Sequence, residues 1–192
     1  MISFREGRAT LLSGSSGSGK SILGAQFLVE GIRQFDQPGV FVTFEEPPDA
    51  IRDNFSSLGW AIDQWEGGGY WAFVDLTPDE DQPEVAGDFG LGALLPRIEH
   101  AVNRTGARRL VIDSLGTLYS QFNNREVVRH ALGQLMAAVR RMGITTLVTA
   151  ERTEESDAVA RYDVEEFVAD SVILLRNALD GNKRRRTIEI LK

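Results

Sequence analysis

A glycine-rich octapeptide, Gly14 to Ser21, carries the residue types that hold phosphate groups. It reads Gly-Ser-Ser-Gly-Ser-Gly-Lys-Ser and matches the P-loop pattern in full. Glycines let successive backbone N–H groups turn inward, and the helix that follows adds partial positive charge. We expect Lys20 to reach the β and γ phosphates of a nucleoside triphosphate, and the Ser21 hydroxyl to bind Mg²⁺.

A second candidate for the Mg²⁺ site is Asp113, which ends the apolar run 109–113. In a P-loop fold the carboxyl end of such a strand faces the nucleotide, so Asp113 can hold Mg²⁺ through water. Taken alone, an Asp at the end of a strand is more often a cap or a turn residue. The P-loop upstream of it favours the metal role.

The general base of hydrolysis must come from elsewhere, because Ser114 stands where some P-loop ATPases carry a catalytic Glu directly after the Asp. Glu45 and Glu46 follow another apolar run and are the candidate catalytic pair, since a carboxylate there can orient and deprotonate the attacking water. The alternative is a charge pair at a helix start. Which of the two lies closer to the water stays open, and Glu151 is the next candidate.

The elements that would position these residues alternate along the chain. Short apolar runs indicate strands at 10–13, 39–44, 71–75, 110–113, 145–149 and 172–175. Apolar residues at helical spacing indicate helices at 20–35, 48–58, 91–102 and 127–139. Residues 183–191 form the returning arm of a hairpin turned at Asp180-Gly181-Asn182. This alternation predicts a three-layer α/β domain with a mostly parallel central sheet and a C-terminal β-hairpin.

Composition limits the class of protein. The chain has 192 residues, which fits one domain over 1–192, and it has no cysteine, which excludes thiol catalysis and disulfides. We see no signal peptide and no apolar run of about 18 residues, so we expect a cytoplasmic protein outside the membrane. The net charge of -7 disfavours binding to nucleic acid or to anionic membranes.

Four segments carry a more specific signal: PGVFVTFEE at 38–46, ARRLVIDS at 107–114, ARYDVEEFV at 160–168 and RRRTIEILK at 184–192. Together they resemble the KaiC family of circadian clock ATPases, and within it the first, N-terminal ATPase domain, over nearly the whole chain. The resemblance implies a RecA-like P-loop fold, a homohexameric ring with Mg-ATP between subunits, and slow hydrolysis with Glu45 and Glu46 as the catalytic pair.

The resemblance also assigns the nucleotide contacts. It implies ATP binding by Gly17, Ser18, Gly19, Lys20, Ser21 and Ile22, with Ser21 at the Mg²⁺, and Ser57 and Lys192 match further nucleotide-contacting positions. The P-loop pattern adds Gly14 to the nucleotide contacts, and the strand-end position adds Asp113 to both the nucleotide contacts and the Mg²⁺ site. Lys192 belongs to a segment that completes a neighbouring subunit's site in this family, and the chain stops there. We therefore expect a fragment of a two-domain protein whose second domain carries serine/threonine autokinase activity.

Partners follow from the same resemblance, and so do the alternatives. A KaiB-like clock protein is expected to dock near the loop 83–89. One alternative is an oligomerisation module that ATP holds together with incidental turnover, and another is a RecA-type DNA-handling ATPase. The basic run 183–186 suits a sheet edge or a subunit interface better than a DNA-binding site, because the chain as a whole is acidic. Thr149 to Arg152 is either a sensor of the γ phosphate or a solvated strand end.

Overall fold

A computed structural model describes residues 4–77, 91–116, 125–152 and 169–192. The strands are β1 Ala9–Gly14, β2 Gly39–Thr43, β3 Trp71–Asp75, β4 Arg109–Asp113, β5 Thr145–Glu151, β6 Ser171–Asp180 and β7 Lys183–Ile190. The helices are α1 Lys20–Phe35, α2 Pro48–Ser56, α3 Ile62–Gly67, α4 Leu91–Thr105 and α6 Arg125–Met142. The expected strands and helices are confirmed. The six-residue α3 was missed because it is too short to show a helical period.

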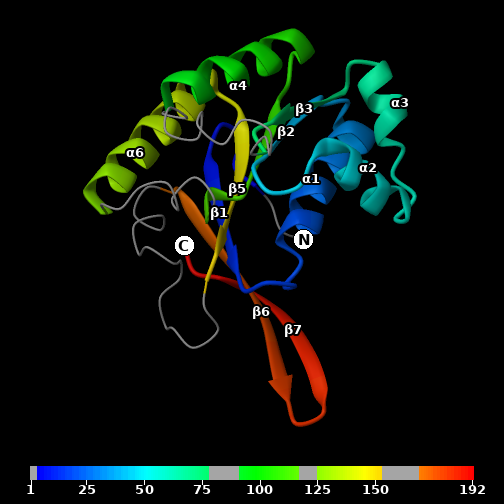
Figure 1. The fold of residues 1–192 in the computed structure, drawn as a ribbon, viewed down its shortest axis with the longest axis vertical. Coiled ribbons are helices and arrows are strands. Elements are labelled where there is room, and N and C mark those ends of the chain that lie inside the picture. The colour runs from blue at the N-terminus through cyan, green and yellow to red at the C-terminus, as the bar shows by residue number, and fades with distance from the viewer. Residues whose placement is uncertain (1–3, 78–90, 117–124, 153–168) are drawn as a thin grey trace.

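One twisted sheet has the strand order β3-β2-β4-β5-β1-β6-β7. Neighbouring strands are parallel from β3 through β6, and β7 returns antiparallel to β6. The hairpin therefore extends past the end of β1, and it projects from the body in Figure 1. This confirms the predicted α/β fold of the RecA-like P-loop kind.

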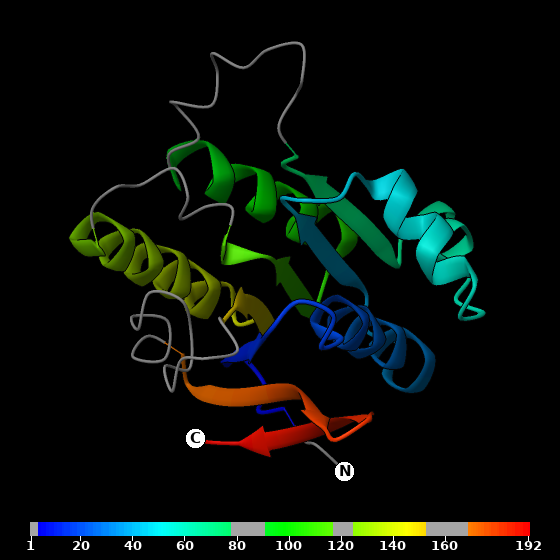
Figure 2. The same ribbon diagram turned by 60° about the horizontal axis from the view of Figure 1, so that its bottom comes forward.

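Helices cover both faces of the sheet, which gives three layers (Figures 1 and 2). α4 and α6 pack on one face, where Ile98 and Leu135 are fully buried. α1, α2 and α3 pack on the other, where Leu28 lies in one cluster with Phe41 and Trp71. Burial on both faces explains why the central strands read as apolar runs without alternation.

Because the strands are parallel, their carboxyl ends meet at one edge of the sheet. Gly14 pairs with Glu151, and Thr43 pairs with Asp113, at the last positions of their strands. The P-loop, the Asp113 strand end and the Glu45-Glu46 segment therefore leave the sheet from the same edge. This is the edge where α/β folds bind ligands.

At the opposite edge of the sheet, Asp170 links several elements through hydrogen bonds. Its Oδ1 accepts hydrogen bonds from Arg8 Nη1 and Arg140 Nη2, both at 3.1 Å, and its Oδ2 accepts one from the Ala9 N–H at 3.0 Å. Burial raises the pKa of Asp170, but the Ala9 N–H and the two guanidinium groups outweigh it and hold this pKa below its ordinary value. The contact joins the start of β1 to the end of α6 and to the segment entering β6.

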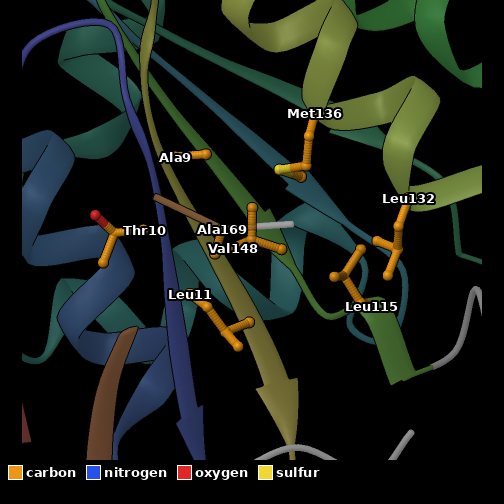
Figure 3. A pocket seen from close by; sticks show the side chains of 8 residues that line it. All are labelled: Ala9, Thr10, Leu11, Leu115, Leu132, Met136, Val148 and Ala169. Carbon is orange, nitrogen blue, oxygen red and sulfur yellow. The ribbon is translucent and has the colours of Figure 1, made fainter. Parts of the chain in front are cut away.

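A small apolar cavity lies under α6, where Leu132 and Met136 point from the helix toward Val148 of β5 (Figure 3). Ala9 and Leu11 of β1 and Leu115 complete part of its lining. Leu132 is 1% exposed, so it belongs to the core while bordering space that no side chain fills.

We predict that Leu132→Ala lowers the free energy of unfolding by about 2–5 kcal/mol, because it enlarges an existing cavity and loses buried area. Val127→Ala on the same helix is the matched control. Val127 is 45% exposed, so its truncation should change stability by about 0.5 kcal/mol or less. Urea unfolding of both variants measures the difference, and equal losses would show that α6 does not pack through its Leu132 face.

Candidate functional site

The P-loop joins β1 to α1 in a conformation that needs its glycines. Gly17 and Gly19 have φ angles of +70° and +100°, which side chains rarely tolerate. A Cβ at Gly14 would stand 2.8 Å from the Leu175 carbonyl oxygen of β6, so the sheet itself excludes a larger residue there. The loop closes with the Ser18 N–H donating to the Ser15 carbonyl at 3.2 Å.

Lys20 opens α1 and is partly buried inside the loop. Its Nζ donates to the carbonyl oxygens of Gly14 and Ser15, both at 2.9 Å. Burial lowers the pKa of Lys20, while the negative charges of Glu151, Asp113 and Glu45 raise it. The structure thus brings three carboxylates from three strand ends around one ammonium group.

Asp113 stands at the end of β4 beside the first turn of α1. Thr149 Oγ1 donates to its Oδ1, and Ser21 is a second hydrogen-bond partner. Burial raises the pKa of Asp113, and the charge of Glu45 adds to this, whereas the two hydroxyl groups and Lys20 lower it. The contact places the two predicted Mg²⁺ ligands, Ser21 and Asp113, next to each other.

These two oxygen donors fit a magnesium ion bound together with phosphate. Mg²⁺ is usually held by one or two protein oxygens plus waters and phosphate oxygens, so it needs no cluster of acidic residues. Within the described ranges no group of three or more His, Cys, Asp or Glu side chains could hold a metal ion. The donor set therefore suits a metal that arrives with the nucleotide.

The structure separates the two candidate bases. The Ser114 hydroxyl donates to Glu45 Oε1 at 2.5 Å, so this carboxylate turns toward β4 and the P-loop. The Glu46 carboxylate instead accepts a hydrogen bond from Asn54 Nδ2 of α2 at 3.2 Å. Both glutamates are exposed. Ser114 was not predicted as a partner of Glu45, nor Thr149 as a partner of Asp113, because nothing in the sequence pairs residues so far apart along the chain.

The hairpin also reaches the P-loop. Asn177 Nδ2 of β6 and Arg186 Nη2 of β7 both donate to the Gly17 carbonyl oxygen at 3.5 Å. A pocket beside the loop is lined by Ser15, Arg152 and the segment of β6 from Leu175 to Ala178. Arg186, the last residue of the basic run 183–186, therefore stands next to the P-loop, a position that the sequence did not reveal.

Three other candidates lie further apart. Ile22 is exposed in the first turn of α1. Ser57 follows α2 and donates to the Asn54 carbonyl at 2.7 Å. Lys192 lies toward the amino end of β6, where its Nζ donates to the Ala169 carbonyl at 3.1 Å. Since β6 runs parallel to β1, Lys192 points away from the P-loop of its own chain.

Two predictions concern segments outside the described residues: the partner-binding loop 83–89 and the motif 160–168. Of the helices that the structure does describe, none is both long and apolar enough to cross a membrane.

Comparison with known proteins supports the sequence signal. The family described as "ATPase: KaiC" matches residues 2–192. The circadian clock protein KaiC3 of Synechocystis sp. is 54% identical over 187 residues, which cover 97% of this chain and 37% of that protein. The circadian clock oscillator proteins KaiC of Synechococcus elongatus and Thermosynechococcus vestitus are 48% and 46% identical over 97% of this chain and 36% of their own lengths. The chain thus spans little more than a third of these relatives.

Proposed function

The chain belongs to the KaiC ATPase family, and on this premise we propose that it binds Mg-ATP at the P-loop and hydrolyses it slowly as a timing step of a circadian clock. The observation that supports this most directly is the convergence of Lys20, Ser21, Asp113 and Glu45 at one edge of the sheet. Lys20 and Ser21 open α1 after β1, Asp113 ends β4 and Glu45 follows β2.

The P-loop would bind the phosphates in the following way. The N–H groups of the loop and the start of α1 offer hydrogen bonds and partial positive charge to the phosphate oxygens. Lys20 exchanges its contacts with the Gly14 and Ser15 carbonyls for the β and γ phosphates. We assign adjoining nucleotide contacts to Gly17, Ser18, Gly19 and Ile22.

Ser21 and Asp113 would hold Mg²⁺, Ser21 directly and Asp113 through water. The bound ion supplies charge neutralisation on the phosphate oxygens. The hydrogen bond that joins these two side chains supports the assignment, because ligands of one ion must be neighbours.

Glu45 is our candidate for the general base. Its charge acts on both Lys20 and Asp113, so it lies within electrostatic reach of the P-loop. The Glu46 carboxylate is engaged by α2, and the Glu46 carbonyl accepts a hydrogen bond from Thr43 Oγ1 at 2.6 Å. We propose that Glu46 shapes the segment while Glu45 orients and deprotonates the attacking water.

We further propose that copies of the chain associate through the hairpin, in a hexameric ring in the full-length protein. β7 is exposed along its whole length, and Leu179, Ile188 and Ile190 are between 54% and 67% exposed. Residues 171–192 contain six Lys or Arg and two Asp or Glu, whereas the whole chain has a net charge of -7. An apolar, basic surface of this kind fits an acidic neighbour of the same sequence.

In such a ring Ser57 and Lys192 would act at the subunit boundary, with Lys192 serving the nucleotide of the neighbouring copy. Its position away from its own P-loop supports a role of that kind. A KaiB-like clock protein is the partner that we propose from the family, and autokinase activity would belong to the second domain of the full-length protein.

We predict that Lys20→Ala weakens ATP binding by about 100-fold or more, because charge-assisted contacts to two phosphates are lost. Arg104→Ala, which removes an equal charge from an exposed residue at the end of α4, is the control and should bind ATP as the unmodified chain does. Isothermal titration calorimetry measures both. Equal affinity for Lys20→Ala and the control would remove the P-loop assignment.

Single substitutions should separate the two glutamates. Glu45→Gln should lower the rate of phosphate release about 10²- to 10⁴-fold with ATP still bound, since the general base is lost. Glu46→Gln should stay within about threefold of the unmodified chain. The reverse pattern would assign the base to Glu46, and two active variants would point to Glu151. Normal assembly with no turnover in the unmodified chain would favour the oligomerisation module.

Substituting the hairpin tests association. We expect sedimentation of the full-length protein to show self-association that Mg-ATP strengthens and that Ile188→Asp combined with Ile190→Asp removes, because the changes place charge on the exposed apolar stripe. Val127→Asp, an equally exposed apolar position on α6, should sediment as the unmodified chain does. Unchanged association of the hairpin variant would show that copies meet elsewhere.

A further inference from the structure

We propose that Ser114 is a positioning residue for hydrolysis: its hydroxyl group fixes the Glu45 carboxylate in the orientation that serves the attacking water. The inference rests on the proposed ATPase function and deepens it. It gives a role to Ser114, which stands where some P-loop ATPases carry a glutamate.

The hydrogen bond joins the buried Ser114 hydroxyl group to the exposed Glu45 carboxylate. Ser114 is 6% exposed and follows the last residue of β4, so its hydroxyl group has little freedom. Glu45 is exposed and follows β2. The distance of 2.5 Å between Ser114 Oγ and Glu45 Oε1 is typical of a hydroxyl group donating to an ionised carboxylate, which is a strong kind of hydrogen bond. The buried residue therefore holds the exposed one.

The backbone around Glu45 is already anchored to the same strand end. The Phe44 N–H donates to the Asp113 carbonyl at 3.0 Å, and Thr43 pairs with Asp113 in the sheet. These contacts fix where the Glu45 side chain begins but leave its rotatable bonds undetermined. A glutamate side chain has considerable rotamer freedom, so a contact at the carboxylate itself is what selects one orientation.

Two neighbouring charges, those of Asp113 and Lys20, pull the Glu45 carboxylate in different directions. Glu45 and Asp113 carry like charges close enough to influence each other, and Lys20 attracts both. Repulsion from Asp113 favours a Glu45 carboxylate turned out to solvent, and attraction to Lys20 favours one turned into the P-loop. The Ser114 hydroxyl donates to this carboxylate and so favours one orientation of it, and a misplacement of about 1 Å can cost about 100-fold in rate.

The test compares Ser114→Ala with Ser114→Thr, which restores the hydroxyl group, in the full chain. We expect Ser114→Ala to lower kcat for ATP about 10- to 100-fold while KM and the calorimetric affinity for ATP change less than about twofold. Ser114→Thr should recover kcat to within about threefold. Thr146→Val is the control: it removes another buried hydroxyl group, whose bond to the Ile144 carbonyl lies at the start of β5, and should leave kcat unchanged.

A double-mutant cycle separates positioning from a structural role. If Ser114 acts through Glu45, adding Ser114→Ala to Glu45→Gln should not reduce the residual rate further. An equal loss in both backgrounds, or a kcat for Ser114→Ala like that of the unmodified chain, overturns the inference and leaves the ATPase function standing. An unmodified chain that binds no ATP or releases no phosphate overturns both. If Ser114→Ala melts more than a few degrees lower, Ser114→Cys, similar in size with a weaker donor, takes its place.

Discussion

The balance of charge around Lys20 is the interaction on which the rest of the site depends. Burial disfavours an ammonium group and lowers the pKa of Lys20, and the carboxylates of Glu151, Asp113 and Glu45 offset part of that effect. Asp113 is repelled by Glu45 and attracted by Lys20. Burial nevertheless dominates at both groups, so that the pKa of Lys20 lies below its ordinary value and that of Asp113 lies above it. In the function that we propose, this cluster would receive the triphosphate and the divalent ion.

The sheet makes this cluster possible. Parallel strands bring side chains that are distant in sequence to a common edge at fixed spacing, and the order β2-β4-β5-β1 places the Glu45 segment, Asp113, Glu151 and the P-loop side by side. Close packing sets the remaining limits: the backbone of β6 at Leu175 leaves no room for a Cβ at Gly14. The glycine at position 14 thus belongs to the P-loop motif and is also required by the packing of β1 against β6.

The sequence predicted the features that depend on residues close together in the chain. Apolar runs identified the strands, and the spacing of glycines with Lys20 predicted a P-loop at the place where the structure shows a glycine-dependent loop between β1 and α1. It did not distinguish Glu45 from Glu46, because adjacent carboxylates look alike until Ser114 and Asn54 engage them from separate elements. It also gave no sign that Arg186 of β7 lies beside the P-loop, since that depends on how far the hairpin extends past β1. Contacts between residues far apart in the chain account for what was missed.

The contact of the hairpin with the Gly17 carbonyl has a thermodynamic consequence. Asn177 and Arg186 contact the Gly17 carbonyl on the outer side of the loop whose inner side would face phosphate in the proposed function, so the position of the hairpin and the shape of the loop are linked. Linkage is reciprocal: if seating the hairpin against another molecule tightens ATP binding tenfold, ATP must tighten that seating tenfold as well, about 1.4 kcal/mol in each direction. Loss of the γ phosphate would then loosen a protein contact without any separate signalling element, and the P-loop itself would transmit the state of the nucleotide.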